Sequence, residues 1–257
     1  MRVVLVGGLG NDAAYFAGLR THLLALDVPT AFVPFGSRAE SRLRDIVRSH
    51  PPEQVALVGN SVGALVALRV ALDTGPRRVV LINPPTLFPE LHDASARHNA
   101  SLRTHPSYAP LRPRWWKDLR PLLWALRVGA PLRPLRHALR LLYERANPQS
   151  PPCVVDNIFR TDLAAQAQLL VRYVLQNDLW SALRALAPRV HILQGSHDDF
   201  AHLARVVRDA VPHVTVKTYH GGHHHALHHP ETVAAMIASS LAAATSNRKV
   251  SSRSSSS

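Results

Sequence analysis

Residues 55–68 read VALVGNSVGALVAL, an order that predicts a buried strand, a tight turn and a helix. Ser61 stands at the apex of the turn, flanked by Gly59 and Gly63. Glycine permits such a turn because a side chain at either position would collide with the strand and helix packed around it. A serine presented in this way becomes a nucleophile when a base and oxyanion-binding N–H groups lie beside it. The pattern alone is equally consistent with an ordinary strand–helix corner.

Short apolar runs alternate with helical patterns on both sides of this turn, and the alternation predicts the fold class. The predicted strands are 2–6, 30–34, 54–58, 78–82, 190–194 and 214–219. The predicted helices around them are 12–26, 38–49, 62–73, 200–211 and 230–244. We therefore expect an α/β fold with a mostly parallel sheet of about six strands and helices on both faces.

The pattern changes in residues 86–187, where prolines, arginines and tryptophans concentrate. Helical periodicity occurs in 119–128, 134–146 and 160–178. Because no strand pattern interrupts these helices, we expect a helical insertion into a single domain spanning 1–245. The core of that domain would be formed by 1–85 and 188–245.

Composition limits the class of protein. The hydrophobic content of 46% is ordinary for a globular chain, and the absence of about 18 consecutive apolar residues predicts no transmembrane helix. Cys153 is the only cysteine, which excludes an intramolecular disulfide and suits a reducing compartment, so we expect a cytoplasmic protein. The serine-rich stretch 246–257 has no apolar pattern and is expected to be a disordered tail.

The positive charge of the chain is concentrated in one segment. The formal net charge is +13, and residues 112–145 hold eight Arg and one Lys against Asp118 and Glu144. Such a concentration is typical of a surface that meets an anionic partner, such as an acidic carrier protein. A solvated arginine-rich face is an equally good interpretation. No recognisable nucleic-acid-binding module is present, so nucleic acid is not expected as a partner.

Two further turns follow predicted strands. The strand 190–194 leads into GSHDD, which places Asp198 four residues past its end, and the strand 214–219 leads into HGGH, which ends at His223. Loops at the carboxyl ends of parallel strands gather at one edge of the sheet. We therefore expect Ser61, Asp198 and His223 to meet at that edge.

These motifs together resemble those of the α/β-hydrolase superfamily, which requires nucleophile, acid and histidine in this chain order. Residues 4–10, VLVGGLG, are similar to the family's first strand and oxyanion loop, with Gly7 where a histidine often stands. The turn 59–63 is similar to its nucleophile elbow, and 195–198 is similar to its acid turn. The segment 86–187 would then be the family's variable lid.

The resemblance implies a serine hydrolase, an esterase or thioesterase, that acts through a covalent acyl-enzyme without a metal or organic cofactor. Ser61 would attack the acyl carbonyl, His223 would transfer its proton, and Asp198 would orient the imidazole. The backbone N–H groups of Leu9 and Val62 would form the oxyanion hole. Acyl transfer, cyclisation and lactone hydrolysis fit the same triad. A binding protein with a vestigial triad is the alternative from another class.

The acid has a rival in the sequence. Asp199 directly follows Asp198 and is a candidate for the same role, although the spacing from Gly195 favours Asp198. A purely structural alternative is that Asp198 caps the helix predicted at 200–211.

The histidine also has rivals. His220, His224 and His225 surround His223, which is favoured by the two glycines before it and by its distance from Pro230. His224 and His228 have the i, i+4 spacing of zinc ligands on a helix, but the Gly-Gly loop before them argues against a regular helix. The expectation for this cluster is therefore no metal.

Overall fold

A six-stranded parallel sheet forms the centre of the protein, in the order β2-β1-β3-β4-β5-β6. The computed structural model describes residues 1–85, 133–146, 149–161, 163–170, 172–173, 179–198 and 201–251. The strands are β1 (Arg2–Val6), β2 (Thr30–Val33), β3 (Val55–Asn60), β4 (Arg78–Ile82), β5 (Val190–Gly195) and β6 (Thr215–Tyr219). The prediction of a mostly parallel sheet of about six strands is confirmed.

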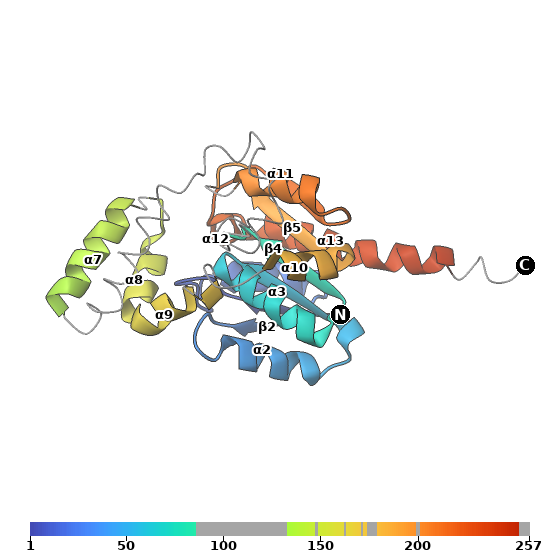
Figure 1. The fold of residues 1–257 in the computed structure, drawn as a ribbon, viewed down its shortest axis with the longest axis horizontal. Helices are drawn as coiled ribbons and strands as arrows, with labels where there is room; N and C mark the ends of the chain where they lie inside the picture. The colour runs from blue at the N-terminus through green and yellow to red at the C-terminus, as the bar shows by residue number, and fades with distance from the viewer. Residues whose placement is uncertain are drawn as a thin grey trace, which may run out of the picture.

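Helices cover both faces of this sheet (Figure 1). The described helices are α1 (Ala17–Ala25), α2 (Ala39–Arg48), α3 (Val62–Thr74), α7 (Arg133–Ala146), α8 (Pro152–Arg160), α9 (Leu163–Leu170), α10 (Leu179–Leu186), α11 (Ala201–Ala210), α12 (His225–His228) and α13 (Pro230–Ser251). Short 3₁₀ turns at Pro52–Gln54 and Ala187–Arg189 lead into β3 and β5. Within the described residues, no helix is both long enough and apolar enough to cross a membrane.

The two faces of the sheet bury different helices because successive strand residues point to opposite sides. On one face, Val4, Leu57 and Leu81 pack with α2, α3, α10 and α11. On the other face, Leu5 and Val58 pack with α1, α8 and α13. The central strands are buried on both sides, which explains why they read as continuous apolar runs rather than as an alternating pattern.

The helices of the segment expected as an insertion differ in part from the prediction. The helical periodicity predicted at 160–178 is borne out in part by α9, but Thr161 has an extended backbone and separates α9 from α8, which was not predicted. The helix α10 was not predicted at all, and its buried Trp180 and Leu183 pack in the same core as α3. This part of the segment therefore belongs to the layer that covers the sheet. The helix predicted at 119–128 lies outside the described residues.

Two helix ends also differ. The helix expected from residue 12 begins at Ala17, because the Asp12 carboxylate accepts the N–H of Tyr15 in a turn at 2.9 Å. At the other end of the chain, α13 continues to Ser251, into the stretch expected to be disordered, and extends away from the sheet in Figure 1. Residues 252–257 lie outside the described part of the chain.

Candidate active site

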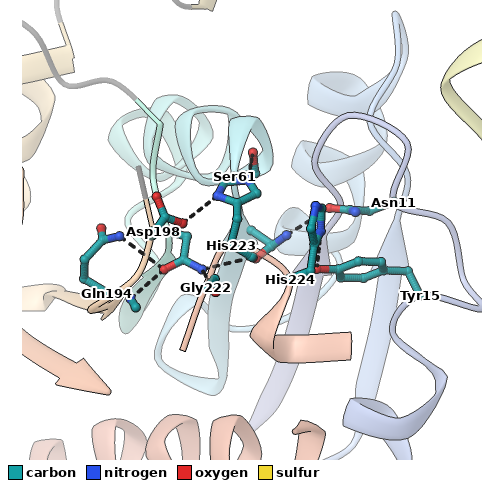
Figure 2. A network of polar contacts seen from close by, with 11 residues as sticks. Asn11, Tyr15, Ser61, Gln194, Asp198, Gly222, His223 and His224 are labelled. Carbon is teal, nitrogen blue, oxygen red and sulfur yellow. Dashed lines mark hydrogen bonds and ion pairs between the residues drawn. The ribbon is translucent and has the colours of Figure 1, made fainter. Parts of the chain in front are cut away.

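The loops that follow β1, β3, β4, β5 and β6 meet at the carboxyl edge of the sheet, as parallel strands require. They carry the residues that the sequence marks as candidates. Figure 2 shows Ser61, Asp198 and His223 close together at this edge. The predicted meeting of these three side chains is therefore what the structure displays.

The turn at Ser61 is sharp and conformationally strained. Ser61 has φ 53° and ψ −129°, a conformation that residues other than glycine seldom adopt. A Cβ atom on Gly59 would lie 2.4 Å from the Ala64 Cα, and one on Gly63 would lie 2.4 Å from the carbonyl oxygen of Val6. Both glycines are therefore required by close backbone approach, and the strained turn pushes the serine out of the strand.

Ser61, His223 and Asp198 are joined by hydrogen bonds. The Nε2 atom of His223 lies 2.9 Å from Ser61 Oγ, and its Nδ1 atom lies 2.6 Å from Asp198 Oδ2. The Asp198 side chain is fully buried, whereas that of His223 is 28% exposed. With Nδ1–H donating to the carboxylate, Nε2 is left to accept the serine proton, which is the arrangement of a general base.

The rivals of these residues lie elsewhere or are not described. Asp199 lies outside the described residues. The His225 ring stacks on Tyr219 with centroids 4.6 Å apart, and the His220 ring packs against His197. Among the histidines of this loop, His223 is the one hydrogen-bonded to both Ser61 and Asp198.

His224, next to the candidate base, is held neutral by its surroundings. Its Nδ1 atom lies 3.4 Å from the hydroxyl of Tyr15 (Figure 2). Burial, together with the neighbouring His223 and His228, lowers the pKa of His224 to about 4. Burial also raises the pKa of Tyr15. At neutral pH this pair is therefore uncharged and adds no positive charge beside His223.

The loop after β1 is supported by two asparagines that the sequence analysis missed. Asn11 Oδ1 accepts hydrogen bonds from the Gly8 N–H and from Asn60 Nδ2, each at 2.9 Å. Asn11 is 6% exposed and Asn60 is 1% exposed. Asn60 directly precedes Ser61, so a buried side-chain bridge joins the turn of the serine to the loop of Leu9. An asparagine next to a glycine in a sequence is typical of a turn with local hydrogen bonds, so the long-range bond between Asn11 and Asn60 was not predicted.

The N–H groups of Leu9 and Val62 are the predicted oxyanion donors. Neither donates a hydrogen bond to another described residue. Val62 is the first residue of α3, where a backbone N–H has no partner inside the helix. The loop of Leu9 also lies against the serine turn, because a Cβ atom on Gly8 would lie 2.8 Å from the Ser61 Cβ.

Helix α8 lies directly on the same loop. Asn157 Nδ2 donates to the Gly10 carbonyl at 3.2 Å. Gly10 has φ 73°, and a Cβ atom there would lie 2.6 Å from the Val154 carbonyl oxygen. A helix from the segment expected to be the lid thus contacts the loop that would bind the oxyanion.

The histidine cluster lies within the described residues, whereas the basic segment lies only partly within them. Among the residues that the structure describes, no group of three or more His, Cys, Asp or Glu side chains is arranged to hold a metal ion. Most of the basic segment 112–145 lies outside the described residues. In its described part, Arg140 pairs with Glu144 at 2.8 Å and with Asp156 at 2.7 Å.

A sequence model of the alpha/beta hydrolase family matches residues 3–236, nearly the whole chain. The chain belongs to the alpha/beta hydrolase family. This membership agrees with the resemblance noted from the sequence motifs. No curated protein sequence matches this hydrolase-family chain significantly.

Solved structures of other proteins share the fold of this alpha/beta hydrolase. MenH from S. aureus superimposes with a TM-score of 0.69 at 14% identity, covering 95% of this chain and 94% of its own. A carboxylesterase from Nitrososphaera gargenis gives a TM-score of 0.60 at 16% identity, covering 96% and 91%. The thioesterase domain of the curacin biosynthetic pathway gives 0.54 at 13% identity, covering 93% and 90%. At these identities the likeness establishes the hydrolase fold and leaves the reaction to be argued from the site.

Proposed function

We propose that the chain is a serine hydrolase that acts on an ester or thioester through a covalent acyl-enzyme. The observation that carries this proposal is the line of hydrogen bonds from Ser61 through His223 to Asp198. A serine hydroxyl is a poor nucleophile until a positioned base removes its proton, and the base holds its orientation through a third group.

In the first half of the reaction, Ser61 Oγ attacks the acyl carbonyl while its proton passes to His223 Nε2. The buried Asp198 carboxylate stabilises the imidazolium that forms and fixes its Nδ1–H. The protonated His223 then donates this proton to the departing alcohol or thiol. In the second half, a water molecule attacks the acyl-enzyme, with His223 again as base, and free acid leaves.

The N–H groups of Leu9 and Val62 would stabilise the negative charge that develops on the carbonyl oxygen. Loss of one such donor typically raises the barrier by about 3–4 kcal/mol. Here the donors are backbone groups, so the glycine at position 7, where a histidine often stands, removes neither of them. The Asn11–Asn60 bridge supplies support for the loop from within this chain.

The acyl group is expected to be selected outside the triad. The segment 86–187 serves as the lid in this proposal, and its helix α8 contacts the loop of Leu9 through Gly10. An acidic carrier protein that presents a thioester stays a prediction from the charge of 112–145. The cytoplasmic location and the single domain spanning 1–245 likewise stay predictions.

Labelling with a fluorophosphonate probe, combined with a panel of p-nitrophenyl esters and acyl thioesters of different chain lengths, tests the proposal. Ser61→Ala should abolish labelling and lower kcat by ~10⁴-fold or more. Labelling that persists in Ser61→Ala would remove Ser61 from its assigned role. Ligand binding without turnover across the whole panel would instead favour the vestigial binding protein.

A further inference from the structure

Asn83, the residue directly after β4, occupies a buried and unusual position. It is fully buried and has φ 46°, a left-handed conformation that asparagine tolerates better than most residues. Its backbone N–H donates to the Leu193 carbonyl of the neighbouring strand β5 at 3.0 Å. The position lies at the same edge of the sheet as the candidate triad.

The side chain of Asn83 joins the end of β5 to the loop that carries His223. Its Oδ1 atom accepts hydrogen bonds from the Gly195 N–H at 2.8 Å and from Gln194 Nε2 at 3.3 Å. Its Nδ2 atom donates to the carbonyl oxygens of Gly222 at 3.2 Å and His223 at 3.0 Å. Figure 2 shows Gln194 and Gly222 in the same cluster of polar contacts as the triad.

These partners fix the orientation of the amide. A backbone N–H requires an acceptor opposite it, and two carbonyl oxygens require donors, so the oxygen must face Gly195 and the nitrogen must face the histidine loop. Both protons of the NH₂ group and two acceptor sites on the oxygen are then used. A buried amide with four hydrogen bonds has a fixed position, and these bonds also restrict the end of β5 and the histidine loop.

Asn83 also connects these loops to the turn of the serine. The carbonyl of Ile82, one residue earlier, accepts the Ser61 N–H at 2.9 Å. The acid and histidine loops bond directly to each other as well, through His197 N–H to the Gly221 carbonyl at 2.9 Å. The bond from His197 to Gly221 holds the acid loop and the histidine loop together. Ile82 and Asn83 connect these two loops to the turn of Ser61.

We propose that Asn83 is a positioning residue for the triad, whose side chain sets the His223–Asp198 pair against Ser61 through the backbones of their loops. The inference rests on the proposed serine hydrolase function. It is carried by the four hydrogen bonds of one buried amide, two to the last residues of β5, which lead into the acid loop, and two to the histidine loop. A displacement of about 1 Å in such a constellation can cost ~10²-fold in rate.

Two substitutions at Asn83 test this role. Asn83→Gly accepts the left-handed backbone and removes all four side-chain bonds. Asn83→Asp keeps nearly the same shape and the acceptor for Gly195, but turns a carboxylate oxygen towards two carbonyl oxygens in the histidine loop. The matched control is His213→Gly, which makes the same kind of change at an exposed residue with φ 75°.

Three measurements on the full chain separate positioning from folding. They are kcat and KM for a p-nitrophenyl ester, the number of active sites titrated with fluorophosphonate, and the low-field proton resonance of the His223 Nδ1–H. Both Asn83 variants should lose ~10–100-fold in kcat per titrated site with KM within about 3-fold of wild type. The resonance should broaden or disappear in both variants and persist in His213→Gly.

The proposal is overturned if either the rate or the resonance stays at the wild-type level in a folded variant. It is also overturned if both variants fail to fold, because Asn83 would then serve folding alone. If the wild-type protein is neither labelled nor active, the proposed function fails. The resonance still decides, without any turnover, whether Asn83 holds the His223–Asp198 pair.

Discussion

Asn60 Nδ2 donates a hydrogen bond to Asn11 Oδ1 at 2.9 Å, a contact between residues that are 49 positions apart. The same Asn11 oxygen also accepts the Gly8 N–H. The turn that presents Ser61 and the loop that carries Leu9 therefore share one buried oxygen. Movement of the loop would leave a buried N–H without a partner, which costs about 1–3 kcal/mol.

Asn11→Ala should therefore weaken both stability and catalysis. We expect a loss of about 1–3 kcal/mol in the free energy of unfolding and a 10–100-fold lower kcat, since the Leu9 N–H loses its support. Urea unfolding and p-nitrophenyl ester kinetics measure the two effects. Asn11→Asp keeps an acceptor for both N–H donors and should recover part of the rate. A wild-type kcat in Asn11→Ala would contradict the supporting role.

Gly63→Ala should damage the protein more than the size of one methyl group suggests. The added Cβ would lie 2.4 Å from the carbonyl oxygens of Val6 and Gly7, and backbone on both sides leaves no room to yield. We expect a loss of about 3 kcal/mol or more in stability, or no folded protein. Gly36→Ala is the matched control, because nothing lies within 4 Å of its added Cβ. Equal melting temperatures for the two variants would refute the close approach.

Asp198→Asn should preserve the fold and remove most of the activity. An amide at this position can donate to Nδ1, which favours the tautomer with the proton on Nε2 and leaves no acceptor for the Ser61 proton. Substitutions of this kind in serine hydrolases lower kcat by about 10⁴-fold. Asp199→Asn should leave kcat within about 3-fold of wild type, as should the exposed control Asp27→Asn. The reverse result would transfer the role of acid to Asp199.

Stability should fall as the pH drops from 6.5 towards 4, partly because of His191. Burial, followed by the positive charges of Arg78 and Lys217, lowers the pKa of this side chain from 6.5 to about 4. Between these values the unfolded chain binds a proton that the folded chain does not, so acid favours unfolding by up to about 1.4 kcal/mol per pH unit. Urea unfolding at several pH values should give a smaller slope for His191→Leu. Identical slopes would contradict this assignment.

The α/β class and most of the sheet could be predicted because the strands are buried. Residues 55–58 and 79–82 are buried in the middle of the sheet and covered on both faces, which favours apolar side chains throughout. The helix α10 was not predicted because its Trp180 belongs to the tryptophan-rich segment 86–187, which was interpreted as an insertion. Its packing beside α3 depends on contacts between segments about 110 residues apart, which no local pattern reports.

The candidate triad shows the same division. Ser61, Asp198 and His223 could be named from the sequence because turn glycines and strand ends are local signals. The order of serine, acid and histidine along the chain also matches the order that the α/β-hydrolase superfamily requires. Asn11, Asn60 and Asn83 carry no such signal, since an asparagine beside a turn usually bonds only to its own neighbourhood. The sequence by itself determined which residues reach the carboxyl edge of the sheet. Only the tertiary structure decided which buried amides hold them there, because hydrogen bonds between distant loops exist only after the strands have paired.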